Sequence, residues 1–149
     1  MDADSESSSV ESGKILLCDD SQTERSALAS YLNRQGYLVD EADEGRSAIE
    51  YLKNHEVDLV LLDLQMPGMD GFDVLTYLQE HRRGLPVILL SGMPVEQIQQ
   101  KIYGLPTHAL PPLFLKPVDL NQLLQVLKLQ LSGQMPDLKP SAEAPNSSN

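Results

Sequence analysis

Two hydrophobic periodicities alternate along the middle of the chain. Five short apolar or alternating runs are typical of strands, at residues 14–18, 37–42, 57–62, 86–90 and 113–115. Each is followed by a segment with apolar residues at helical spacing. Strict alternation of strand and helix predicts a parallel sheet covered by helices on both sides. We therefore expect an α/β fold with a doubly wound, five-stranded parallel sheet and right-handed crossovers.

Local signals mark the ends of these helices. Ser21 followed by Glu24 predicts a capping box at the start of the first helix, and Gly36 follows its end. The middle helices are expected at about 45–55, 70–82 and 95–103. The last helix begins at Asp119 and stops near Gly133. Its spacing places five leucines on one face: Leu120, Leu123, Leu124, Leu127 and Leu131.

The two ends of the chain differ in composition from its middle. Residues 1–12 are acidic and serine-rich, and residues 132–149 are rich in Pro, Ser and Asn. Neither segment has enough apolar residues to offset the entropy of ordering, so we expect disordered tails or linkers. The domain itself is expected at residues 13–131, either standing alone or at the front of a longer protein.

Composition excludes several classes of function. The 149 residues carry 22 acidic and 11 basic side chains, and the net charge of −11 argues against binding nucleic acid through its phosphates. No apolar stretch reaches the length of a membrane span, and the N-terminus lacks a signal sequence. The only cysteine, Cys18, lies in an apolar run and is expected to be buried. A reducing, cytoplasmic location fits this cysteine content.

Polar side chains follow four of the five predicted strands. Asp19 and Asp20 follow the first strand, Asp63 the third, Ser91 the fourth and Lys116 the fifth. Each alone is an ordinary turn or surface residue. The carboxyl ends of parallel strands, however, meet at one edge of the sheet, where ligands bind. Three acids, a hydroxyl and one lysine at that edge predict a single clustered site.

The residue types in this cluster favour phosphoryl chemistry. Three carboxylates with one lysine call for a hard divalent cation, and Mg²⁺ suits them because it also binds phosphate. A carboxylate can act as a nucleophile and form an aspartyl phosphate. Asp63 follows the central buried strand, so we assign it as the acceptor and assign Asp19 and Asp20 as metal ligands. Mg²⁺, Lys116, and Ser91 with nearby backbone N–H groups would each bind one phosphoryl oxygen.

Four short runs carry a resemblance to a known family: LLCDD (16–20), LVLLDLQMPGMDG (59–71), ILLSG (88–92) and LFLKP (113–117). In this order and spacing they resemble the response-regulator receiver domain of two-component signalling, including its chemotaxis regulators. The resemblance covers about residues 13–131 and implies a (βα)₅ flavodoxin-like fold.

The resemblance also assigns roles to the site residues. It makes Asp63 the phosphoacceptor, Asp20 a direct Mg²⁺ ligand, Asp19 a ligand that often acts through water, and the backbone carbonyl of Gln65 a further ligand. Lys116 would bind the phosphoryl group, and the Ser91 hydroxyl would move towards it. Apart from self-catalysed phosphotransfer and autodephosphorylation, no enzymatic activity is implied.

The implied partners are proteins. The phosphodonor would be a phosphohistidine on a sensor histidine kinase or a histidine phosphotransfer protein. A downstream protein target, or self-association, would use the face formed by strand five and the last helix. Neither nucleic acid nor a membrane is expected as a partner of this domain.

Two departures from the family concern this output face. Leu113 occupies a position where the family usually has Tyr or Phe, and Phe114 should point to the opposite face of the strand. Residues 104–112 are rich in proline where the family commonly has Gly-Ala. Both departures bear on signal transmission rather than on phosphorylation.

Three alternatives remain open at this stage. A haloacid-dehalogenase-like phosphohydrolase also uses an aspartyl nucleophile, but it needs a second Asp where Gln65 stands, a late acidic motif and a cap domain. A nucleotide-binding module would need a glycine-rich phosphate loop, which the sequence lacks. A receiver-shaped adaptor that is never phosphorylated is the third alternative, and the intact site argues against it.

Overall fold

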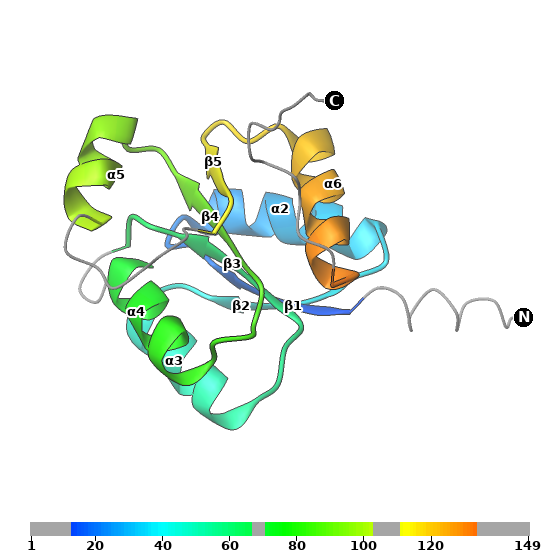
Figure 1. The fold of residues 1–149 in the computed structure, drawn as a ribbon. Helices are drawn as coiled ribbons and strands as arrows, with labels where there is room; N and C mark the ends of the chain where they lie inside the picture. Colours follow the sequence, from blue (N-terminus) through cyan, green and yellow to red (C-terminus); the bar gives the residue numbers. More distant parts are fainter. Residues whose placement is uncertain (1–12, 67–70, 103–110, 134–149) are drawn as a thin grey trace, which may run out of the picture.

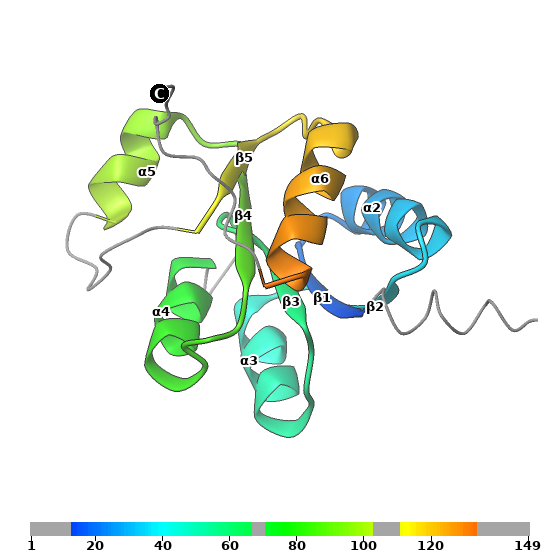
Figure 2. The same ribbon diagram turned by 45° about the vertical axis from the view of Figure 1, so that its right-hand side comes forward.

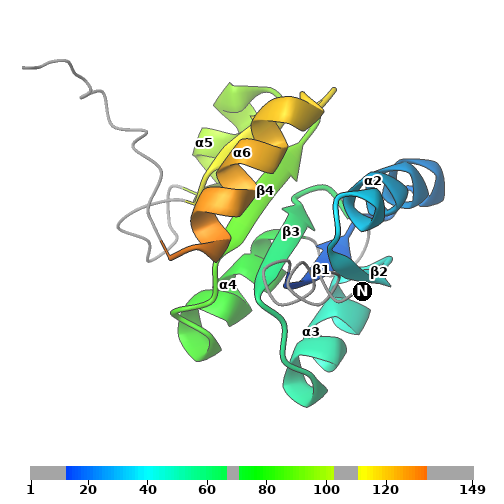
Figure 3. The same cartoon turned by 90° about the vertical axis from the view of Figure 1, so that its right-hand side faces the viewer.

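The structure is a computed structural model that describes residues 13–66, 71–102 and 111–133 (Figure 1). Its centre is one five-stranded parallel sheet with the strand order β2-β1-β3-β4-β5. The strands are β1 (Lys14–Cys18), β2 (Leu38–Ala42), β3 (Leu59–Asp63), β4 (Val87–Ser91) and β5 (Leu113–Leu115). Figure 3 shows β4, β3, β1 and β2 following one another across the sheet. The predicted doubly wound α/β fold is confirmed.

In the part of the chain that the structure describes, five helices cover the two faces of the sheet. They are α2 (Gln22–Arg34), α3 (Gly45–Asn54), α4 (Gly71–His81), α5 (Val95–Ile102) and α6 (Leu120–Leu131). Helices α2 and α6 lie on one face, and α3, α4 and α5 lie on the other (Figure 2). Alternate strand residues divide the core in the same way: Leu17 and Leu61 pack with α2 and α6, whereas Leu16 and Leu62 face the opposite layer.

The predicted strands are found with small shifts in their ends. The third and fourth strands continue one residue further than predicted, so Asp63 and Ser91 are the last strand residues and not the first loop residues. Cross-strand pairing explains the extension, because Asp63 lies opposite Leu90 and Ser91 lies opposite Leu115. Apolar pattern alone ends a strand where polarity begins, whereas hydrogen bonding to a neighbour continues it.

The leucine face of α6 is confirmed in part. Leu123 and Leu127 are fully buried, and Leu124 and Leu131 pack partly against the same core. Leu120 has the helical spacing of the same face, but it is 39% exposed. Leu120 is the first residue of α6 and borders an open cavity between α2 and α6, so no packed neighbour covers it.

Two further observations bear on the expected class of protein. Cys18 is buried, as predicted, and its thiol is free. Among the helices that the structure describes, none has the length and apolar content needed to span a membrane.

Candidate functional site

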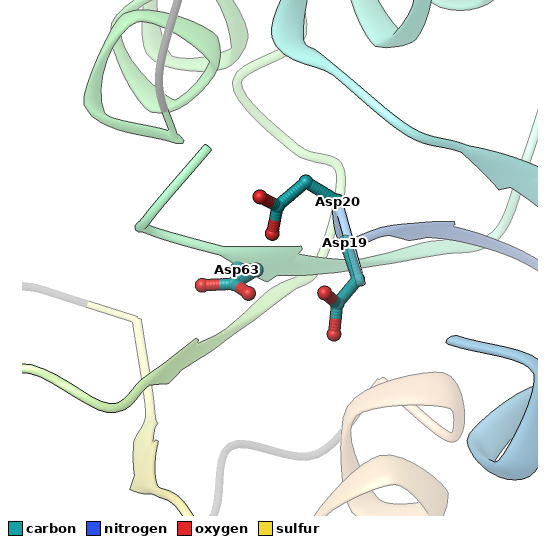
Figure 4. Close-up of side chains that lie close together, drawn as sticks. All are labelled: Asp19, Asp20 and Asp63. Atoms are coloured by element: carbon teal, nitrogen blue, oxygen red, sulfur yellow. The ribbon is translucent and has the colours of Figure 1, made fainter. Parts of the chain in front are cut away.

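The carboxyl ends of three strands bring charged side chains to one point. Asp19 directly follows β1, Asp63 ends β3 and Lys116 directly follows β5. Each lies two positions after a strand residue that faces the α2 and α6 layer, so the strand alternation directs all three side chains to that side. Figure 4 shows Asp19, Asp20 and Asp63 gathered where β1 and β3 end.

The charged groups lie within contact distance of one another. One carboxylate oxygen from each of Asp19, Asp20 and Asp63 lies within 4.8 Å of the other two. The Lys116 ammonium lies 2.8 Å from Asp63 Oδ2 and 3.4 Å from Asp19 Oδ2. Asp63 is only 2% exposed, whereas Asp20 is exposed to solvent. The cluster therefore contains a buried carboxylate–ammonium pair with the exposed carboxylate of Asp20 beside it.

Burial dominates the electrostatics of Asp63. It raises the pKa of this carboxyl from 3.8 to about 6, although the hydrogen bonds from Lys116 and the Gln65 N–H favour the charged form. Burial alone would lower the pKa of Lys116, but its hydrogen bonds to Asp63 and Glu24 raise it overall. Lys116 is thus charged at neutral pH, and its single charge faces several carboxylates.

Backbone groups fix the orientation of the two buried carboxylates. The Gln65 N–H donates to Asp63 Oδ1 at 2.8 Å, and the Ser21 N–H donates to Asp19 Oδ1 at 2.9 Å. Arg25 adds a bond from Nη1 to the carbonyl oxygen of Asp19 at 2.7 Å. Each carboxylate therefore has one oxygen held by its own loop and the other directed towards Lys116.

Gly71 allows α4 to begin against the backbone at the end of β3. A Cβ at this position would overlap the carbonyl oxygen of Asp63 and lie 2.5 Å from Leu64 Cα. The Gly71 N–H donates to the Leu64 carbonyl at 3.3 Å, which joins the start of α4 to the end of β3. Only glycine permits this approach, because it has no Cβ. Gly71 therefore helps to set the backbone geometry next to Asp63.

Comparison with known proteins identifies the family. Residues 15–128 match the response regulator receiver domain. The chain belongs to this family. It is 36% identical over 117 residues to the autoinducer 1 sensor kinase/phosphatase LuxN of Vibrio campbellii, an alignment that covers 78% of this chain and 13% of LuxN. It is 32% identical over 120 residues to sporulation initiation phosphotransferase F of Bacillus subtilis, covering 79% of this chain and 93% of that protein.

A solved structure supports the same assignment. The signal receiver domain of a signal transduction histidine kinase from Syntrophus aciditrophicus superposes with a TM-score of 0.73 at 27% identity, covering 92% of this chain and 98% of that one. The chain spans 56% of the response regulator MprA of Mycobacterium sp., which is 31% identical over 134 residues. It therefore corresponds to only part of some of its relatives.

The receiver site has donors that fit Mg²⁺. Receiver domains use Mg²⁺ at this acidic pocket, and they act as phosphoacceptors for histidine kinases or phosphotransfer proteins. In this chain, carboxylate oxygens of Asp19, Asp20 and Asp63 converge from two strand ends. Lys116 balances only part of their charge, and hard carboxylate oxygens are the ligands that Mg²⁺ prefers. The donor set and the excess negative charge both suit a divalent cation.

Ser91 and Gln65 bond to the loop that follows β4. Ser91 is fully buried, and its Oγ accepts a hydrogen bond from the Met93 N–H at 2.9 Å. The side chain of Gln65 accepts from the Gly92 N–H at 2.9 Å. From the sequence, only the backbone carbonyl of Gln65 is expected to take part, as a metal ligand, and this side-chain contact is not predicted. No local pattern could indicate it, because the two residues are 27 positions apart.

The predicted capping box of α2 forms only in part. Ser21 Oγ accepts from the Glu24 N–H at 3.3 Å, as predicted. The reciprocal half is wrong: the Glu24 carboxylate bonds the Lys116 ammonium at 2.7 Å. The Ser21 N–H is instead satisfied by Asp19. Glu24 was predicted to cap the helix, but its side chain belongs to the site.

Leu113 and Phe114 pack on opposite faces of β5. Leu113 is partly buried against the core of the α3, α4 and α5 layer, whereas Phe114 packs on the opposite face. The prediction that Phe114 points to the opposite face of the strand from Leu113 is confirmed. Two parts of the predicted motifs lie outside the described residues: residues 104–110 of the proline-rich segment, and Pro67 and Gly68 of the run at 59–71. Nearly all of the predicted tails also lie outside them.

Proposed function

We propose that this receiver domain accepts a phosphoryl group on Asp63 from a phosphohistidine of a sensor kinase or a histidine phosphotransfer protein. One observation carries the proposal: the Lys116 ammonium lies 2.8 Å from the buried Asp63 carboxylate, inside a cluster of three carboxylates. A buried nucleophile with a cation beside it and acidic ligands around it suits phosphoryl transfer, which depends on positioning and charge neutralisation.

The transfer step exchanges one bond to phosphorus for another. A carboxylate oxygen of Asp63 forms the new P–O bond, the donor's P–N bond breaks, and its electron pair returns to the imidazole nitrogen. Lys116 would donate a hydrogen bond to a phosphoryl oxygen as charge shifts during transfer. The Gln65 N–H, which already holds Asp63 Oδ1, would keep the nucleophile oriented.

We assign the metal site to the carboxylates of Asp19, Asp20 and Asp63 and the carbonyl of Gln65. When bound, Mg²⁺ supplies neutralisation of the phosphoryl oxygens. The Ser91 hydroxyl and the Gly92 N–H would donate hydrogen bonds to another phosphoryl oxygen. The Ser91 hydroxyl would turn from Met93, and the Gln65 side chain would release the Gly92 N–H.

We also propose a cellular location and an output surface for this phosphoacceptor. The chain would act as a phosphoacceptor and not as a turnover enzyme, and the free, buried Cys18 suits the cytoplasm. The face of β5 and α6 would bind a downstream protein or a second copy of the chain. Leu115, which is 47% exposed in the edge strand β5, supports an output surface there.

The test is stoichiometric phosphorylation measured by intact mass. With Mg²⁺ and acetyl phosphate, the protein should gain one phosphoryl group, Asp63→Asn should gain none, and EDTA should stop the reaction. Asp58→Asn is the matched control, because it makes the same substitution at an exposed position before the other end of β3. Labelling that survives Asp63→Asn would refute the acceptor assignment, and an unlabelled wild-type protein would favour an adaptor that is not phosphorylated.

A further inference from the structure

The Lys116 ammonium makes its shortest contact with Glu24. The Nζ–Oε1 distance is 2.7 Å, compared with 2.8 Å to Asp63 and 3.4 Å to Asp19. The Glu24 side chain is 56% exposed, whereas those of Asp63 and Asp19 are 2% and 3% exposed. The lysine is therefore shared between the buried acceptor and a carboxylate at the surface of α2.

The backbone of the first turn of α2 fixes the place of Glu24. Ser21 Oγ holds the Glu24 N–H, while the Ser21 N–H bonds the Asp19 carboxylate. Arg25 anchors the same turn by bonds to the Asp19 carbonyl at 2.7 Å and to Glu41 at 2.9 Å. These contacts tie the start of α2 to the end of β1, so the backbone of Glu24 has a fixed position beside the site.

Sharing the ammonium limits what it can offer to a phosphoryl group. An ammonium has three N–H donors and no acceptor, and three carboxylates surround this one. A phosphoryl oxygen gains a donor from Lys116 only when one of these bonds weakens. Glu24 can give way most easily: it is the most exposed of the three, and it borders a cavity of about 280 Å³ between α2 and α6.

We propose that Glu24 is a positioning residue that holds the Lys116 ammonium towards α2 and thereby slows phosphorylation of Asp63. The inference rests on the proposed function, because it concerns how Lys116 meets the phosphoryl group. Neutralising Glu24 removes a charge that competes for the lysine. Glu24 thus sets the rate at which the site accepts phosphate, without touching the phosphoryl group itself.

Phosphorylation rates with acetyl phosphate and Mg²⁺ provide the first test. Glu24→Gln should be phosphorylated about two- to fivefold faster than wild type, the factor expected for a partly exposed ion pair. Glu24→Asp keeps the charge at the helix start but is one methylene shorter, roughly 1.5 Å, and should be accelerated similarly. Glu56→Gln removes the acid of a remote ion pair with Arg82 and should leave the rate unchanged.

Two further measurements separate positioning from a general charge effect. In a Lys116→Ala background, Glu24→Gln should change the slower residual rate by less than about 1.5-fold, because its effect requires the lysine. In the unphosphorylated protein, the side-chain ¹⁵N and ¹³Cε NMR signals of Lys116 should shift in Glu24→Gln and in Glu24→Asp, but not in Glu56→Gln.

The outcomes distinguish this inference from the proposed function. If wild-type protein is not phosphorylated on Asp63, the function fails, whereas the NMR arm still reports whether Glu24 holds Lys116. If wild type is phosphorylated but Glu24→Gln reacts at the wild-type rate or slower, the inference is refuted. Equal acceleration in the Lys116→Ala background, or a wild-type rate in Glu24→Asp, would also refute it, because either result assigns the effect to charge alone.

Discussion

Replacing Asp63 by Asn should stabilise the metal-free protein at neutral pH. Burial raises the pKa of Asp63 from 3.8 to about 6, so the native state holds the proton more tightly than the unfolded state does. At about 1.4 kcal/mol per pKa unit, keeping this carboxylate charged lowers native stability by about 3 kcal/mol. Asn is neutral and avoids that loss, although its single amide oxygen can accept from either Lys116 or the Gln65 N–H and not from both.

The pH dependence follows from the raised pKa. Below about pH 4 the carboxyl is protonated in both states, and its contribution to stability is fully present. As pH rises through about 6, the native carboxyl ionises and that contribution is lost. The stability advantage of Asp63→Asn should therefore be small near pH 4 and reach its full size by about pH 7.5.

Urea unfolding in EDTA, followed by circular dichroism, measures the effect. With slopes of about 1–3 kcal/mol per molar urea, the Asp63→Asn midpoint should lie about 1–3 M above wild type at pH 7.5. The two midpoints should converge towards pH 4. Asp58→Asn is the control, because it makes the same substitution at an exposed position before the other end of β3, and it should not raise the midpoint. Added Mg²⁺ should raise the wild-type midpoint and reduce the difference.

The opposite order of stability would contradict this prediction. If Asp63→Asn is less stable than wild type at pH 7.5 without metal, the ion pair with Lys116 outweighs the burial of the carboxylate. The site would then be a net source of stability, and burial would not dominate the electrostatics of Asp63.

Three other predictions follow from the fold. Gly71→Ala should destabilise the protein by more than about 2 kcal/mol in urea unfolding, because its Cβ overlaps backbone, while Gly84→Ala, which has open space around it, should change stability little. A chain of residues 13–132 should melt within a few degrees of the full chain; a loss above about 2 kcal/mol would show that a tail docks on the domain. With beryllofluoride, hydrogen exchange should change more in 91–112 than in 113–127, because Leu113 has no aromatic ring to rotate; a full response in 113–127 that persists in Leu113→Ala would contradict this.

The pattern of residues along the chain was enough to predict the α/β architecture and to place Asp63 in the cluster at the strand ends. Strand and helix periodicities differ along the chain, and their alternation allows few arrangements other than a doubly wound sheet. Because carboxyl ends of parallel strands share one edge, Asp19, Asp63 and Lys116 could be placed together without coordinates. The family resemblance added roles for these residues, but the clustering itself depended on strand order and chain direction.

The packed fold determines which partner each polar group takes. Glu24 has the spacing of a capping residue, yet its carboxylate bonds Lys116, which is 92 positions away, while Asp19 satisfies the backbone N–H that Glu24 was expected to cap. The Gln65 side chain likewise reaches Gly92 across two loops. Local pattern reports what a residue can bond near itself in the chain. The choice among competing donors depends on distances that exist only after the sheet has brought its strand ends together.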